Sequence, residues 1–138
     1  MKTWERAERK IAVGVRGRRT PGSGNGNIKG DVITREWCIE VKETSRQPMI
    51  FHFNWLRKAA LEASRMRRKP ALVVELHDGS NLCFVPTDEE ANKTVSGKFT
   101  MSLNRGDLSP GDVISVSSLN WKVLDLSEFE EVMDGINE

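Results

Sequence analysis

Residues 71–76 read ALVVEL, a nearly unbroken apolar run of strand length between Pro70 and the turn sequence HDGSN. Such a run predicts a strand that is covered on both faces, as a central strand is in a sheet flanked by helices. A second run, LCFVP at 82–86, follows the turn and predicts an antiparallel neighbour. We therefore expect an α/β fold, with more strands beside this pair and helices on both faces.

Two segments ahead of this run have helical periodicity. In the sequence TWERAERKIAV, residues 3–13, apolar positions recur at helical spacing and Glu8 lies on their side. Residues 53–69 give a second amphipathic pattern, which is basic at its C-terminal end and is stopped by Pro70. Between the two helices we expect a short strand near 13–18 and then a glycine-rich loop, GRRTPGSGNGNIKG at 17–30, through which no helix passes.

The rest of the chain predicts further strands and an acidic end. The segment TDEEANKT, residues 87–94, is typical of a short capped helix, and KFTMSL, DVISVS and NWKVLDL follow as strands. A last acidic helix is expected at 127–135. We divide the chain into a core at 1–95 and an acidic C-terminal extension at 96–138 that packs beside it.

Cysteine content and hydropathy favour a reducing interior. Cys38 and Cys83 fit no metal-ligand spacing, and both stand inside apolar runs, where a reduced thiol behaves as a small hydrophobic group. No apolar run approaches the roughly 18 residues that a membrane span needs, and no secretory signal is evident. We expect no membrane association and a location in the cytoplasm of a bacterial, archaeal or phage-infected cell.

The net charge of +1 conceals a strong asymmetry. Residues 1–69 contain 17 Lys and Arg against 7 Asp and Glu, a balance of +10, whereas residues 70–138 contain 4 against 13, a balance of −9. The basic segments RGRR at 16–19 and RMRRK at 65–69 are suited to neutralising phosphates and attracting a nucleic acid. A solvated basic face without a ligand is the alternative interpretation.

The stretch GDVITREWCIEVK, residues 30–42, predicts a tight hairpin that brings charged groups together. Two β-rich runs are separated by the polar pair RE, and period-two alternation puts Glu40 and Lys42 on one face of the second strand. Asp31 begins the partner strand, so its carboxylate is expected within a few ångströms of Glu40. Mg²⁺ takes one or two carboxylates and keeps water and phosphate as its other ligands. The same spacing also suits a surface hairpin whose charges pair in solvent.

A longer pattern resembles a known family. GD followed by IEVK resembles the PD-(D/E)xK signature of restriction-endonuclease-like nucleases, with Gly30 where many members have proline. The chain also resembles the archaeal-type Holliday junction resolvases and related phage nucleases. The resemblance lies in the order of its motifs, which is Glu8, then RTPGSG at 19–24, then the acidic pair and the lysine. The resemblance runs from about Trp4 to Pro86. It departs from the family in the insertion NGNIK, and nothing beyond Pro86 matches.

The resemblance implies a restriction-endonuclease-like core at residues 1–95, with a mixed sheet flanked by helices. It implies that Asp31, Glu40 and Glu8 hold Mg²⁺, with Mn²⁺ able to substitute, and that Lys42 is the catalytic lysine. The enzyme would be a Mg-dependent endodeoxyribonuclease of DNA recombination and repair, acting on branched DNA as a homodimer. The residues expected to contact DNA are Arg16, Arg18, Arg19, Ser23, Lys29, Arg65, Arg67, Arg68 and Lys69.

Other interpretations stay open. A nucleic-acid-binding module could keep this fold without turnover, and a nicking or flap-cutting phage nuclease would need the same site. The apolar segment MIFHFNWL, residues 49–56, is either dimer surface or core. We interpret Trp37 and Trp55 as core residues rather than base-stacking platforms, and His52 as a packing or hydrogen-bonding residue rather than a second general base.

Overall fold

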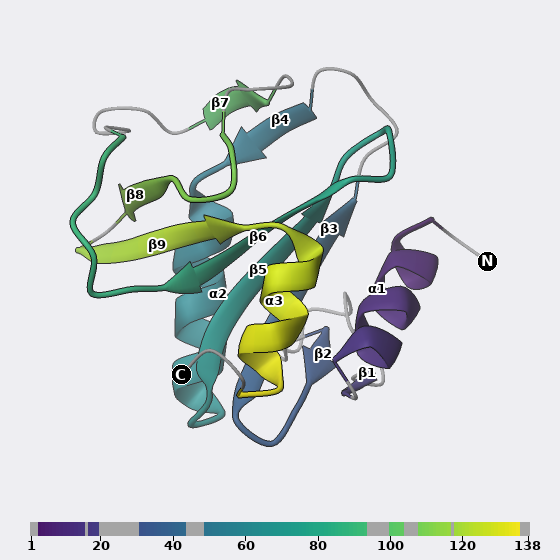
Figure 1. The fold of residues 1–138 in the computed structure, drawn as a ribbon. Helices are drawn as coiled ribbons and strands as arrows, with labels where there is room; N and C mark the ends of the chain where they lie inside the picture. Colours follow the sequence, from purple (N-terminus) through teal and green to yellow (C-terminus); the bar gives the residue numbers. More distant parts are fainter. Residues whose placement is uncertain are drawn as a thin grey trace.

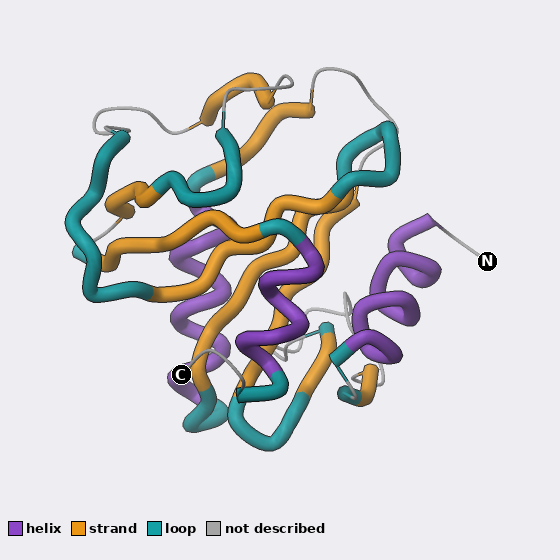
Figure 2. Tube along the Cα trace, viewed as in Figure 1, coloured by secondary structure: helices purple, strands orange, loops and turns teal. Residues whose placement is uncertain are grey.

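A computed structural model describes residues 3–15, 17–19, 31–43, 49–93, 100–103, 108–116 and 118–135. Within these residues a sheet separates two helical layers (Figure 1). The helices α1 (Thr3–Gly14) and α3 (Leu126–Met133) cover one face, and α2 (Asn54–Arg65) covers the other. Figure 2 shows the same arrangement, with helices on both sides of the central strands. The mixed sheet flanked by helices confirms the predicted fold class.

The described residues form one large sheet and one small sheet. The strand order of the large sheet is β1-β2-β3-β5-β6-β9-β8, and β4 pairs with β7 separately. Among the described strand pairings only that of β3 with β5 is parallel, since α2 forms the crossover between them. The strands are β1 (Arg18–Arg19), β2 (Val32–Ile33), β3 (Trp37–Glu43), β4 (Met49–His52), β5 (Lys69–Glu75), β6 (Asn81–Pro86), β7 (Thr100–Leu103), β8 (Val113–Val116) and β9 (Leu119–Leu124).

Strand β5 lies at the centre of the large sheet, as its apolar run predicts. Ala71 and Val73 pack with side chains of α1 and α3, while Leu72 and Val74 pack with side chains of α2. All four are fully buried. Because successive side chains of a strand point to opposite faces, one apolar strand contributes to both cores. Cys83 of β6 is free and buried beside it.

The predicted hairpin is also confirmed. Strands β2 and β3 are antiparallel, with Val32 opposite Ile39 and Ile33 opposite Cys38. The turn between them is closed by Thr34, whose Oγ1 accepts a hydrogen bond from the Trp37 amide at 3.0 Å. The register is therefore set locally, by a short turn between two β-rich runs.

Helix α2 ends four residues earlier than predicted, because the chain reverses at Arg67. This residue has a φ of 55°, in the left-handed region, and the Arg68 amide donates to the Ala63 carbonyl at 2.9 Å. Lys69 and Pro70 already belong to β5. A residue before proline is disfavoured in the helical region, so Lys69 is extended.

Two smaller predictions were wrong. The strand expected near 13–18 starts later than predicted: residues 13 and 14 still belong to α1, and the strand β1 is formed by Arg18 and Arg19. Residues 87–93 form no helix. Instead, their backbone bonds to the neighbouring strands, with the Thr87 amide donating to Asn120 and the Asn92 amide to Val113, each at 2.9 Å. Backbone pairing with β8 and β9 thus replaces the expected local helix.

The C-terminal region contributes to the same cores. Trp121 and Val123 of β9 are buried and pack with Phe84 of β6. Helix α3, predicted at 127–135, begins with a capping box in which Asp125 accepts from the Glu128 amide. Its Phe129 is fully buried against the α1 side of the sheet. No helix in the described ranges is long and apolar enough to cross a membrane.

Candidate active site

Two buried carboxyl groups face each other across the hairpin. Asp31 directly precedes β2, and the register of that strand sets it opposite Glu40 of β3. Only 9% of the Asp31 surface and 8% of the Glu40 surface are exposed. Both groups lie on the α2 face, because Ile33 and Cys38, at alternate positions of the same strands, pack with Ala63 of α2. The expected acidic pair is thus formed, and it is buried rather than exposed.

The Asp31 carboxylate is held by the backbone. Its Oδ2 accepts a hydrogen bond from the Val41 amide at 2.8 Å, where β2 has not yet begun to pair with β3. Burial raises the pKa of Asp31. The bond from Val41, the nearby Lys42 ammonium and a hydrogen bond shared with Glu40 act in the opposite direction. Asp31 therefore has a defined orientation and a partly compensated charge.

Glu40 is the most strongly perturbed group of the site. Burial, a hydrogen bond shared with Glu62 and the nearby Asp31 charge raise its pKa to about 10, against the lowering effect of Lys42. Glu40 thus keeps its proton at neutral pH in the cation-free protein. Its Oε1 atom is buried and has no hydrogen-bond partner. An oxygen in this state is available to a ligand.

Glu62 is a third buried carboxyl that is absent from the predicted site. It lies on α2, is 5% exposed, and its Oε2 atom also has no hydrogen-bond partner. It reaches Glu40 directly and affects the pKa of Asp31 through its charge. The sequence does mark Glu62, because it is an acidic residue within the apolar stripe of a predicted helix, three residues after Ala59 and four before Met66.

Lys42 extends from the same face of β3 as Glu40. It is half-buried, its charge acts on both members of the acidic pair, and its Nζ lies 5.7 Å from the centre of the Trp55 ring. The structure therefore brings together the two carboxyls and the lysine that the hairpin pattern indicates.

Glu8 approaches from another direction. It is 3% exposed on α1, and the apolar side chains of that helix, such as Ile11, pack with Ile39 and Val41. Those two residues point to the face of β3 opposite Glu40. The predicted role of Glu8 in the site therefore stays a prediction.

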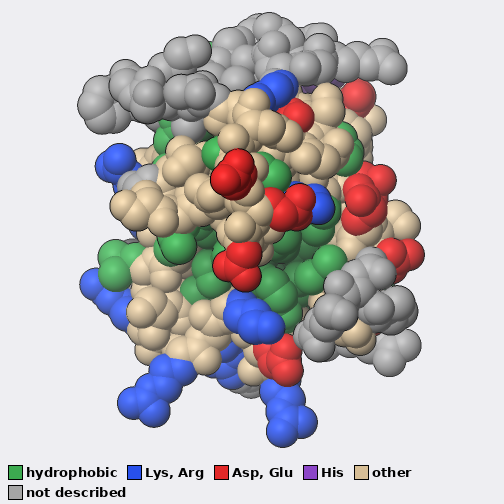
Figure 3. Space-filling model, turned by 60° about the vertical axis from the view of Figure 1, so that its left-hand side comes forward, with side chains coloured by type: hydrophobic (Ala, Val, Ile, Leu, Met, Phe, Trp, Pro, Cys, Tyr) green, Lys and Arg blue, Asp and Glu red, His purple; other side chains and the backbone are tan. Residues whose placement is uncertain are grey.

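The basic residues at the end of α2 differ in their environment. Arg65, Arg67 and Lys69 are exposed, whereas Arg68 is half-buried and its Nε donates to the Thr34 carbonyl at 2.9 Å. Figure 3 shows Lys and Arg side chains along the lower edge of one face of the molecule. Arg18 and Arg19 form β1, and their side chains are outside the described structure. Arg16, Ser23 and Lys29 lie outside the described residues.

The carboxylate oxygens of the site suit a hard cation that takes only a few of its ligands from the protein. In the described part of the chain, no group of three or more His, Cys, Asp or Glu side chains is arranged to hold a metal ion. Mg²⁺ needs only one or two carboxylates, because water and phosphate supply its remaining ligands. Asp31 and Glu40 meet this requirement, and the orphaned oxygens of Glu40 and Glu62 are donors of the right type.

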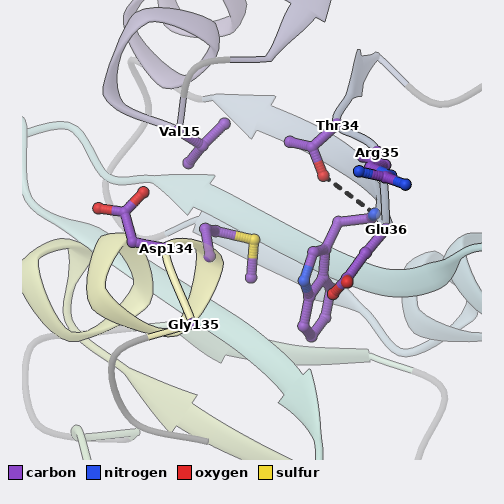
Figure 4. Close-up of a pocket in the computed structure, with 8 residues that line it drawn as sticks. Val15, Thr34, Arg35, Glu36, Asp134 and Gly135 are labelled. Carbon is purple, nitrogen blue, oxygen red and sulfur yellow. Dashed lines mark hydrogen bonds between the residues drawn. The ribbon is translucent and has the colours of Figure 1, made fainter.

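A separate pocket lies on the opposite face of the sheet. It has a volume of about 550 Å³ and lies between the end of α1, the turn from β2 to β3, and the end of α3. Figure 4 shows Val15, Thr34 and Asp134 around it. Because Val15 belongs to the apolar cluster under α1 and α3, this pocket is distinct from the acidic pair.

Comparison with known proteins gave a likeness to solved structures. No protein-family model and no curated protein matches the chain. Among solved structures, the chain is similar to Hjc of Archaeoglobus fulgidus, a Holliday junction resolvase from an archaeal hyperthermophile. The alignment covers 70% of this chain and 85% of that one, with a TM-score of 0.49 and 17% sequence identity.

Proposed function

We propose that this protein is a metal-dependent, structure-selective DNA endonuclease that hydrolyses phosphodiester bonds in branched DNA. The observation that carries the proposal is the buried pair of Asp31 and Glu40, with Lys42 on the same face and an orphaned oxygen on Glu40. Buried acids beside a lysine are costly to keep unless they serve a ligand.

Each residue has a role in hydrolysis. Asp31 and Glu40 would hold Mg²⁺ or Mn²⁺ through carboxylate oxygens, with the Glu62 carboxyl beside them and Glu8 as a further acidic group. When bound, such an ion polarises the scissile phosphate and lowers the pKa of water. Lys42 would orient the attacking water or offset the negative charge of the pentavalent phosphorane. The water would lose a proton to solvent as its oxygen adds to phosphorus, one ester P–O bond would break, and the leaving sugar oxygen would take up a proton from solvent.

The basic half of the chain supports DNA as the substrate. Residues 1–69 carry a balance of +10, and exposed Arg65, Arg67 and Lys69 offer contacts to phosphates. Paired cuts in a branched molecule require two active sites, so we propose a homodimer. Within the segment 49–56, Phe51, Phe53 and Leu56 are buried in the core, whereas Ile50, His52 and Asn54 are exposed. Light scattering of the purified protein gives the oligomeric state.

The deciding experiment compares four-way junction, flap, duplex and single-stranded DNA, each with Mg²⁺, Mn²⁺ or chelator. We expect cleavage of a branched substrate only when a cation is present. Asp31→Asn and Glu40→Gln should bind DNA normally and lose cleavage by several orders of magnitude. Glu90→Gln, at an exposed acid outside the site, is the control. Full activity in either site variant would refute the assignment.

DNA binding without turnover is the second candidate, and one observation favours it. With a pKa of about 10, Glu40 is neutral at pH 7 and gives a cation no charge until it loses its proton. A pure binding protein would retain DNA in chelator and leave every substrate intact after Mg²⁺ or Mn²⁺ is added, including at pH 9.

A further inference from the structure

Two aromatic rings border the proposed site at the junction between β4 and α2. His52 ends β4 and Trp55 lies in the first turn of α2, with their ring centroids 5.2 Å apart and an angle of 57° between the ring planes. His52 is exposed and Trp55 is half-buried. Trp55 packs against the core, as its apolar neighbours predict, without being fully buried.

The core fixes the orientation of Trp55. Its ring packs edge to face against Phe51 at 5.3 Å, and Phe51 is fully buried. Phe51 in turn contacts Phe53 and Phe84. One side of the indole is therefore anchored in a rigid aromatic cluster, while the neighbouring imidazole remains on the surface. An anchored ring loses little conformational entropy when a ligand stacks on it.

The ring pair is continuous with the catalytic groups. Lys42 Nζ lies 5.7 Å from the centre of the Trp55 ring, and the same ammonium group acts on Asp31 and Glu40. Exposed Arg57 and Lys58 follow on α2. Aromatic rings among basic side chains are typical of surfaces that bind single-stranded nucleic acid.

We propose that His52 and Trp55 receive an unpaired nucleobase of the DNA strand whose phosphate enters the acidic site. This inference rests on the proposed function and adds the substrate feature that is recognised. Stacking on an aromatic ring tolerates any base, because every base has a π face. Bases inside a duplex already stack on each other, whereas a base at a branch point is free to leave the helix. The ring pair thus selects branched DNA over continuous duplex.

The test measures binding in chelator, so that its result does not depend on cleavage. Fluorescence anisotropy compares a fork with one unpaired base at its branch, the same fork with an abasic residue there, and a continuous duplex. His52→Ala should weaken binding to the intact fork roughly tenfold, the usual effect of removing one stacking platform. Binding to the duplex should not change. Asn54→Ala, at an exposed position that lies between His52 and Trp55 in the sequence, is the matched control.

A cycle of protein and substrate changes gives the decisive readout. The abasic residue should weaken binding of the wild-type protein as much as His52→Ala does, and the two changes together should cost no more than either alone. Trp55→Leu, checked for folding by circular dichroism, should behave in the same way. The proposal would be overturned if the abasic residue and His52→Ala together weakened binding by the product of their separate effects. It would also be overturned if His52→Ala weakened binding to the duplex as much as binding to the fork. Base-dependent binding without any cleavage would preserve this inference and reject the nuclease.

Discussion

Glu40 is a carboxyl group buried beside two others, Asp31 and Glu62, and this has a consequence for folding. In the cation-free protein the folded state keeps the Glu40 proton up to a pH of about 10, while an unfolded glutamate releases it near its ordinary pKa of 4.5. Between these two values the unfolded state binds fewer protons, so rising pH favours unfolding. Burial of Glu40 therefore makes the protein less stable toward alkaline pH.

Glu40→Gln tests this linkage. The variant lacks the titrating group, so in chelator its free energy of unfolding should exceed that of the wild type at pH 8. The difference should grow with pH by up to about 1.4 kcal/mol per unit. Urea unfolding at pH 5, 7 and 9 measures it, with Glu90→Gln as the control. Parallel pH profiles for wild type and Glu40→Gln would contradict the assigned environment.

Glu62 contributes to that environment from α2. Glu62→Gln keeps a group that can hydrogen bond to Glu40 but removes a nearby charge. Both the hydrogen bond and the charge of Glu62 raise the pKa of Glu40, although burial has the larger effect. We expect the pKa of Glu40 to fall below its wild-type value, measured by carboxyl carbon chemical shifts in a pH titration. Glu43→Gln, on the same strand but on the opposite face, should leave that titration unchanged.

Among the structural elements, α3 depends most visibly on its N-terminal cap. Asp125 accepts a hydrogen bond from the Glu128 amide at 2.8 Å, and the Glu128 side chain accepts one from the Asp125 amide at 3.1 Å. Since Phe129 of this helix is fully buried, loosening its first turn affects the main core.

Asp125→Ala should lower the free energy of unfolding by about 1 kcal/mol, because it leaves the Glu128 N–H without its side-chain acceptor. Urea denaturation at pH 7 measures the decrease. Ser127→Ala, at an exposed position in the same turn, serves as the control. An equal midpoint for both variants would mean that the cap does not stabilise α3.

Tertiary contacts affect where a helix or strand begins and ends more than they affect whether a segment is a helix or a strand. The helical period of residues 53–69 correctly indicates α2, but the helix stops at Arg65 because β5 begins at Lys69, beside Trp37 of β3. Similarly, residues 87–93 carry a local helix signal that loses to hydrogen bonds with β8 and β9. Those partner strands lie 20 or more residues further along the chain, outside the range of any local pattern.

Across the whole molecule, opposite charges are divided between the two halves of the chain, and the basic half is the expected contact with DNA. Exposed Arg65 and Arg67 are suited to phosphate contact, whereas Arg68 holds the turn between α2 and β5 through Thr34. Arginines that are adjacent in sequence thus have different roles.

Salt dependence separates these roles. Arg65→Ala with Arg67→Ala should weaken DNA binding and reduce the slope of log affinity against log salt by about 0.9 for each phosphate that is no longer neutralised. Anisotropy titrations in chelator at several salt concentrations give the slope. Arg68→Ala should instead lower the thermal midpoint, since its guanidinium donates to two carbonyl groups. An unchanged slope in the double variant would remove these arginines from the DNA-binding surface.

Short-range patterns were sufficient for the hairpin and for its acidic pair. A tight turn joins β2 and β3, so the register that sets Asp31 opposite Glu40 follows from the segment 31–43 alone, and alternation along β3 places Lys42 beside them. The apolar run at 71–76 likewise identifies the central strand without any partner, because only a strand covered on both faces tolerates it.

Packing between distant segments decided the rest of the site. Glu62 reaches Glu40 only because α2 crosses over β3, and Trp55 meets Lys42 only because Phe51 anchors its ring. The C-terminal strands join the same sheet through β6 and β9. Each of these contacts is chosen by the fit of surfaces brought together on folding, whereas turn chemistry and hydrophobic period act over a few neighbouring residues.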